Sequence, residues 1–318
     1  MTGRDASRAG LVLVAVFLAM SAARDVFFAK VFQGIDVFAV TALVFGATAV
    51  LFAGSTLRDR RQWRRSEREL PSILAVNALT AAAWLSYLWA VKLLEPAVAN
   101  TIWSGVGPLT VASLAARAPG ARRTAPAEPF SGLERLAHLG MLGTLVFLAV
   151  AAIGGHSGIS TTAPWRTAAG VALAAGSGVA IAVAIVVTKR LHDAGLSARQ
   201  VVALRFCLLV IVAGLAGIAG LGGGSAGLTG AGQRFTDAAH LVPAGLVLVA
   251  LPIYALQAAV VRLRPMTIEA IAALGPPLVF ALQAFDGRLH FSSFTLAGVM
   301  GYAACTILAA AARLAGRP

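Results

Sequence analysis

The stretch LLEPAVANTIWSGVGPLTVASLA at residues 93–115 recurs, with changes, as RLRPMTIEAIAALGPPLVFALQA at residues 262–284. The two align without gaps at an offset of 169, with the matches Leu94/Leu263, Pro96/Pro265, Ile102/Ile271, Pro108/Pro277, Leu109/Leu278, Ala112/Ala281 and Ala115/Ala284. Upstream, at an offset of 160, Ala9-Gly10 falls on Ala169-Gly170 and Lys30 falls on Arg190. The second half of the chain therefore echoes the first, which indicates an internal duplication.

The composition indicates a membrane protein. Of 318 residues, 58% are hydrophobic and 12% charged, and the mean hydropathy is +0.83, unlike an ordinary soluble domain. Apolar runs of about 20 residues can each cross a hydrocarbon core of about 30 Å, and their lack of a two-residue alternation excludes a β-barrel. Cys207 and Cys305 fall inside such runs, so no disulfide framework is expected. Ten spans are predicted, at 9–29, 37–56, 71–91, 97–116, 136–154, 167–188, 199–220, 240–261, 266–285 and 293–312.

The repeat and the spans together predict a topology. Each unit contains five spans, and an odd number forces the second unit to enter the membrane upside down. We therefore predict an all-α integral membrane fold of ten transmembrane helices in two inverted five-helix repeats, at 1–156 and 165–318. Two similar units that can exchange conformations make inward-open and outward-open states similar in energy, which is typical of transporters that work by alternating access.

The formal net charge of +13 is unevenly placed. With the N-terminus in the cytosol, 19 of the 26 Lys and Arg residues lie on the cytosolic side, five lie on the other side, and Arg24 and Arg205 lie within spans. This asymmetry follows the positive-inside rule, places both termini in the cytosol, and explains the charge without a nucleic-acid partner. Alternatively, Arg4 and Arg8 before an apolar run could mark a cleaved signal peptide, but its removal would destroy the repeat.

The motifs also resemble a known family. The segment LWAVKLLEPAVANTIWSGVGPL and its second copy, LQAAVVRLRPMTIEAIAALGPPLVFALQAFDGRL, resemble the drug/metabolite transporter superfamily with its pair of EamA-type five-helix repeats, as does ALRFCLL at 203–209. The resemblance covers essentially the whole chain and implies a ten-helix permease of the cell inner membrane. The chain departs from the family pattern in lacking an acidic residue after Arg117, where the second copy has Asp286, and in having Met20-Ser21 where span one usually carries Trp-Gly.

Arg24 and Asp25 are candidate residues of the solute path, because both lie within span one. Each charge near mid-bilayer costs about 2.5–3.5 kcal/mol on insertion scales, so a lipid-facing pair is unfavourable. Adjacent residues point about 100° apart on a helix, which predicts poor alignment for a direct pair and at least one side chain facing a central cavity. The alternative is a locally neutralised pair that reaches the outer surface.

Aromatic and amide residues are further candidates. Trp84 and Tyr87 share a helix face and, with Trp103, would form a cavity wall suited to amphiphilic or ring-containing solutes. The alternative for these rings is packing, and Trp89 fits an interfacial belt.

The repeat places Asn100 opposite Glu269, as paired gate positions. Glu269 could instead complement a helix N-terminus, and Arg205 could pair with it or reach the surface. Gln257 and Gln283 could bind helices or solute.

Prolines near the centres of spans predict helix kinks, at Pro108, Pro252, Pro276 and Pro277, because each removes a helical hydrogen bond. Kinks that serve only packing are the alternative to a broken helix facing the solute.

The function predicted is secondary transport, most simply export, of a small amphiphilic metabolite such as an amino acid or a natural product. The five histidines are scattered, and no metal site, nucleotide-binding loop or nucleophile motif occurs, so neither an enzyme nor a cofactor is expected. A flippase for lipid headgroups on the same fold is the alternative, and an integral-membrane enzyme is a weaker one. If protons drive transport, Glu269 is the better acceptor, since Asp25 adjoins Arg24. Partners are the solute, the bilayer and protons, whereas the solute's identity, the direction, the coupling and the oligomeric state stay open.

Overall fold

The computed structural model describes residues 3–56, 60–117, 131–159, 163–222, 230–260, 262–263, 271–272, 274–287 and 289–315. Within these ranges the chain is all-α. The helices are α1 (Gly3–Val31), α2 (Val37–Thr56), α3 (Arg60–Arg68), α4 (Leu70–Leu93), α5 (Pro96–Arg117), α7 (Gly132–Ile153), α8 (Pro164–Asp193), α9 (Ala198–Leu204), α10 (Cys207–Ile218), α11 (Ala231–Ala239), α12 (Val242–Gly245), the π-helical turn η2 (Leu246–Ala250), α13 (Leu251–Val260), α15 (Gly275–Gln283) and α16 (Ser293–Ala315).

Eight helical segments of the described chain are long and apolar enough to cross a bilayer: Arg8–Val31, Val37–Thr56, Leu70–Leu93, Gly132–Ile153, Pro164–Asp193, Ala198–Ile218, Val242–Ala259 and Ser293–Ala312. Their number makes the protein a multi-pass, all-α membrane protein. The predicted span 97–116 coincides with α5, a helix of 22 residues. The predicted span 266–285 falls partly outside the described residues, and α15 covers its last part.

The lipid-facing surface is apolar. On α7, leucines at 133, 136, 139 and 142 are exposed, and Val146 and Val150 continue the exposed stripe. A stripe of this length is unfavourable in water and is expected where lipid chains surround a helix.

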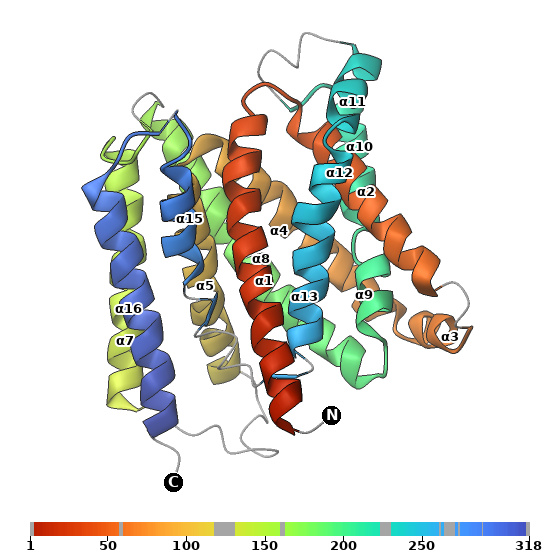
Figure 1. The fold of residues 1–318 in the computed structure, drawn as a ribbon, viewed down its shortest axis with the longest axis horizontal. Coiled ribbons are helices and arrows are strands. Elements are labelled where there is room, and N and C mark those ends of the chain that lie inside the picture. The colour runs from red at the N-terminus through yellow and green to blue at the C-terminus, as the bar shows by residue number, and fades with distance from the viewer. Residues whose placement is uncertain are drawn as a thin grey trace.

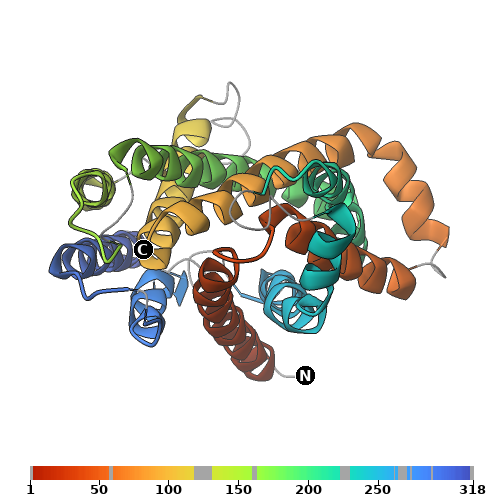
Figure 2. The same cartoon turned by 90° about the horizontal axis from the view of Figure 1, so that it is seen from above.

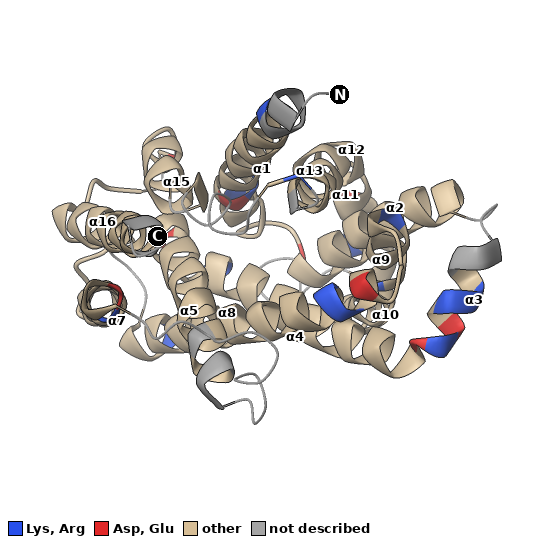
Figure 3. Cartoon of the chain, turned by 90° about the horizontal axis from the view of Figure 1, so that it is seen from below, with Lys and Arg blue, Asp and Glu red and all other residues tan. Residues whose placement is uncertain are grey.

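The two ends of the molecule differ. The start of α1, the end of α16 and the basic helix α3 lie at one end, called here the α3 end (Figures 1 and 3). The turn after α4, the turn after α7 and the segment before α16 meet at the opposite end, where Gly158 N–H donates to Glu95 and His290 N–H donates to Gly158 O. This second end is called the Glu95 end.

Helices that are distant in sequence pack side by side. α4 runs along α8, α5 also packs on α8, and α1 packs on both α13 and α15. At the two flanks, α7 pairs with α16 and α2 pairs with α10 (Figures 1 and 2). The main core lies between α1, α2, α4, α8 and α10, where Phe45 contacts the rings of Trp84 and Phe206 at 4.8 and 5.1 Å between centroids.

The seventh predicted span is broken at Arg205 and Phe206, between α9 and α10. Asn77 of α4 joins the two pieces: its Nδ2 donates to Leu204 O at 2.8 Å, and its Oδ1 accepts from Leu208 N–H at 3.1 Å. The amide thereby satisfies backbone groups that a continuous helix would have paired internally.

We expect Asn77→Leu to lower the free energy of unfolding by about 1–3 kcal/mol, because it leaves these buried backbone groups unpaired. Thermal unfolding in detergent measures the change, and Gln233→Leu on the exposed face of α11 is the control. Equal stability of the two variants would show that the break needs no bridging amide.

The prolines occupy three different settings. Pro108 lies inside α5, and the helix continues through it. Pro252 is the second residue of α13, which follows η2 directly. Pro276 and Pro277 lie in the first turn of α15, where a missing N–H costs no helical hydrogen bond. Part of the segment before α15 lies outside the described residues, so the kink expected at Pro276 and Pro277 stays a prediction.

Candidate functional site

The centre of the site is a buried ion pair between neighbouring residues of α1. Arg24 and Asp25 are 3% and 2% exposed, and Arg24 Nε and Nη2 lie 2.8 and 2.7 Å from Asp25 Oδ1. The expectation of a poorly aligned pair is wrong, because the arginine side chain is long enough to fold back onto the adjacent carboxylate. Asp25 lies six residues before the end of α1, hence about 9 Å inside that helix.

The second oxygen of Asp25 is held by two other helices. Tyr87 of α4 donates its hydroxyl to Asp25 Oδ2 at 2.6 Å, and Asn100 of α5 donates Nδ2 to the same oxygen at 2.7 Å. Asn100 Nδ2 also lies 3.3 Å from the Tyr87 hydroxyl. Asp25 therefore accepts hydrogen bonds from α1, α4 and α5 at once, which stabilises its charge in the interior.

Aromatic rings enclose this pair. The Arg24 guanidinium carbon lies 4.9 Å from the centre of the Trp84 ring and 6.0 Å from that of Tyr87, within cation–π range. Trp103 of α5 packs against Tyr87 at 5.1 Å between ring centroids. By contrast, Trp89 stacks on Phe38 of α2, and the Lys92 ammonium lies 5.1 Å from the centre of the Trp89 ring.

Two oxygens beside the ion pair have unused hydrogen-bonding capacity. Ser21 Oγ and Asn100 Oδ1 are buried and make no hydrogen bond with the described residues. A Cβ added to Gly275 would lie 3.7 Å from Asn100 Oδ1, so this oxygen faces the start of α15. Each unpaired group is a position where a polar solute could bind.

The structure thus brings together six of the residues predicted from sequence: Arg24, Asp25, Trp84, Tyr87, Asn100 and Trp103. Gln257 is not with them; its Oε1 lies 3.2 Å from His192 Nε2 near the α3 end. Glu269 lies outside the described residues, and with it the predicted gate pairing with Asn100.

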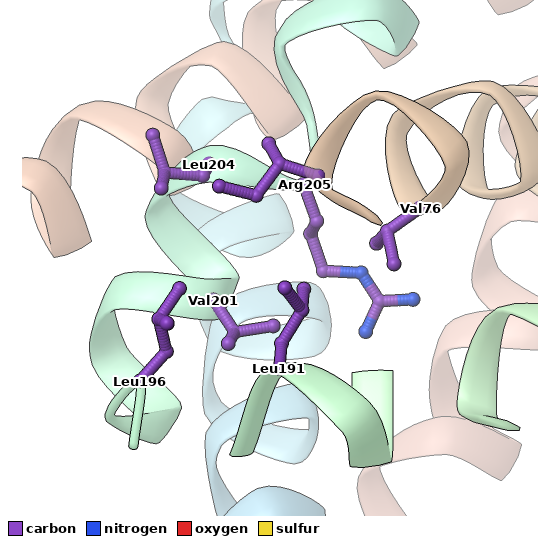
Figure 4. Close-up of a pocket in the computed structure, with 7 residues that line it drawn as sticks. Val76, Leu191, Leu196, Val201, Leu204 and Arg205 are labelled. Carbon is purple, nitrogen blue, oxygen red and sulfur yellow. The ribbon is translucent and has the colours of Figure 1, made fainter. Parts of the chain in front are cut away.

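Arg205 occupies a separate hollow near the α3 end. Its Nη2 donates to Thr80 Oγ1 at 3.2 Å, and its guanidinium lies 5.5 Å from the centre of the Phe206 ring. The walls are aliphatic and come from α4, α8, the turn after α8, and α9: Ile73, Val76, Leu191, Leu196, Val201 and Leu204 (Figure 4). No surface escape of the guanidinium is seen, since Arg205 is 6% exposed.

The sequence reasoning missed a second buried polar cluster, at the Glu95 end. Glu95 Oε2 accepts from Gly158 N–H at 2.7 Å and from the Thr295 hydroxyl at 2.8 Å, and Oε1 accepts from Gln283 Nε2. Gln283 Oε1 in turn accepts from Ala97 N–H at 3.1 Å. A carboxylate directly before the proline that begins a span was the available signal in the sequence.

Comparisons with known proteins identify the fold and no more. No family model matches the chain, and no curated protein matches it either. Eight chains of solved structures match. One, titled "Crystal structure of protein", aligns over 100% of both chains with a TM-score of 0.60 at 20% sequence identity, so the protein shares its overall fold with that structure.

Proposed function

We propose that this protein is a secondary transporter that moves a small amphiphilic metabolite, such as an amino acid, across the inner membrane by alternating access, in the direction of export. The observation that carries the proposal is the buried Arg24–Asp25 pair, which is closed off among aromatic rings in the interior of a membrane protein. Ionisable residues in such positions are expensive and mark solute or ion pathways.

The chemistry of the pair favours a zwitterion. A carboxylate on the solute can replace Asp25 on the Arg24 guanidinium, while a solute ammonium can take the Asp25 oxygens. Trp84, Tyr87 and Trp103 would then cover the apolar part of the solute. The Arg24–Asp25 pair is then replaced by two ion pairs, one between each residue and the solute. No charge is left buried without a partner, so the main cost of removing charges from water is avoided.

The packing of the helices supports two inverted five-helix repeats of the EamA type. In such a repeat, each span of the first unit corresponds to the span five places later in the chain. If α1 and α4 are the first and third spans, they correspond to α8 and α13, the sixth and eighth. Exchange of the two units therefore converts the pair α4–α8 into α13–α1. The same exchange converts α5–α8 into α15–α1, and it maps α7–α16 and α2–α10 onto themselves. All six pairs are in contact. With α3 and both termini in the cytosol, the Glu95 end is the outer end.

A binding and counterflow experiment tests the function. Purified protein is screened by thermal shift, and then in vesicles, with amino acids bearing aromatic or long aliphatic side chains, their methyl esters and their N-acetyl forms. We expect only the zwitterions to bind and exchange, because each derivative lacks one of the two charges.

Tyr87→Phe should weaken zwitterion binding about tenfold, since it removes a hydrogen bond to a charged acceptor. Tyr254→Phe, far along the chain on α13, is the matched control. Competition by lipids with amino headgroups, but not by soluble zwitterions, would instead indicate a flippase, and exchange that is insensitive to both charges would refute the site.

A further inference from the structure

The Glu95 cluster joins four segments from both halves of the chain. Glu95 lies in the turn between α4 and α5, Gly158 lies in the connection after α7, Gln283 ends α15, and Thr295 lies in the first turn of α16. Any movement that opens the molecule between its halves at this end must separate Glu95 from at least one of these partners. The cluster therefore has the position of a latch.

The contact is closed against water. Glu95 is 1% exposed. A Cβ on Gly158 would lie 2.6 Å from His290 O and 3.2 Å from Glu95 Cδ, so only glycine permits this approach of the two backbones to the carboxyl group.

The hydrogen bonds suit a carboxyl group that gains and loses a proton. Among the described residues no cation pairs with Glu95, and a buried carboxylate without a counter-ion favours its neutral form. Ala97 N–H fixes the orientation of the Gln283 amide, so Gln283 and Gly158 can only donate to Glu95. The Thr295 hydroxyl can either donate or accept, so it can accept a hydrogen bond from Oε2 when that oxygen carries the proton.

We propose that Glu95 is a proton-operated latch of the transporter: proton uptake accompanies closure of the Glu95 end, and proton release accompanies its opening. The inference rests on the proposed function for its role, and on the cluster's own geometry for its mechanism. It assigns a proton-binding site to a carboxyl group separate from the Arg24–Asp25 pair.

The sign of the pH dependence follows from linkage. Burial raises the pKa of Glu95, and the hydrogen bonds from Gly158, Thr295 and Gln283 lower it, burial being the larger effect. Opening to water returns the pKa toward its ordinary value, so the closed form binds the proton more tightly. Acid therefore favours closure, and opening grows as pH rises through the pKa of the closed form.

Other charged or titratable groups lie on the surrounding elements: Lys92 on α4, His156 after α7, Arg166 on α8, and Asp286 and His290 between α15 and α16. Lys92 donates to Gly222 O, and the His156 ring stacks on Phe294. The variants below distinguish the titration of Glu95 from that of these neighbours.

Cysteine accessibility tests the latch without any solute. Val279 is fully buried on α15, one helical turn before Gln283. In full-length protein with Cys207 and Cys305 replaced by alanine, Val279→Cys is labelled by a membrane-impermeant thiol reagent. Rates are divided by those of Ala239→Cys, an exposed position on α11, to remove the pH dependence of the reagent. We expect labelling to rise about tenfold from about pH 5 to about pH 8, because the closed form binds the proton more tightly than the open form.

Two carboxyl-to-amide substitutions provide the comparison. Glu95→Gln cannot ionise and should hold the latch closed, so labelling should stay slow at both pH values. Glu134→Gln changes another buried carboxyl, at the opposite end, where glutamine also completes the capping box with Ser131, and should keep the full pH response. A pH response that survives Glu95→Gln, or is absent from the unsubstituted protein, would overturn the latch.

Thr295→Val gives a second test that leaves Glu95 in place. Removing the hydroxyl removes a hydrogen bond that lowers the pKa of Glu95, so the midpoint of the labelling curve should move to higher pH. An unchanged midpoint or a shift to lower pH would contradict the proposal. A protein that exchanges no zwitterion but shows the Glu95-dependent labelling would refute the proposed transport and leave the latch intact.

Discussion

Replacing Asp25 by alanine is expected to lower the free energy of unfolding by about 3–5 kcal/mol, because the Arg24 guanidinium is then buried without its carboxylate. The same change should abolish solute exchange. Removing both charges as Arg24→Met with Asp25→Ala should restore most of the stability, since an apolar pair needs no counter-ion, while exchange stays absent.

Thermal unfolding in detergent and counterflow in vesicles measure the two effects separately. Asp193→Ala, which breaks the exposed pair with Lys189 at 3.6 Å, is the control and should leave stability nearly unchanged. If Asp25→Ala were as stable as this control, Arg24 would have another partner in the interior. If the double variant still exchanged zwitterions, the ion pair would have no part in binding.

Gly178→Val is expected to have the second largest effect, a loss of about 3 kcal/mol together with weaker solute binding. A Cβ on Gly178 would lie 2.6 Å from the backbone oxygen of Trp103 and 3.0 Å from Val106 Cβ, so any side chain pushes α8 away from α5. Overpacking of this kind forces backbone shifts, and the displaced backbone carries Trp103.

Gly176→Val is the matched control for Gly178→Val, because nothing lies within 4 Å of a Cβ at that position of the same helix. Its stability should stay within about 0.5 kcal/mol of the unsubstituted protein. Thermal unfolding and zwitterion affinity are measured for both. Equal losses in the two variants would mean that helix propensity, and not the contact between α5 and α8, causes the effect.

The sequence predicted the membrane class and most spans because hydrophobic length is a property of the composition of each segment. It also selected six side chains that the fold brings together, because charges and aromatic rings in apolar runs have few reasons to be there. It could not predict the bond between Arg24 and Asp25, which depends on the rotamer of a long side chain. The hydrogen bond of Gln257 to His192 likewise depends on how α13 packs near α8 and α9, which hydropathy does not encode.

Helix breaks were the least predictable feature. The break between α9 and α10 is stabilised by Asn77, which comes from α4 and stands 127 residues before Leu204 in the chain. Pro276 and Pro277 give the same local signal whether they bend a helix or begin one. Only the arrangement of the neighbouring segments distinguishes the two outcomes.

The π-helical turn Leu246–Ala250 before Pro252 sets the phase of the helix that follows it. A π-turn holds one residue more than an α-turn, so α13 is rotated by about 100° from where an uninterrupted helix would place it. The side chains that α13 presents to α1 therefore belong to a different helical face from the one that counting from Val242 would select. The extra residue held in the π-turn therefore changes which side chains of α13 contact α1, and it does so without changing the length of any loop.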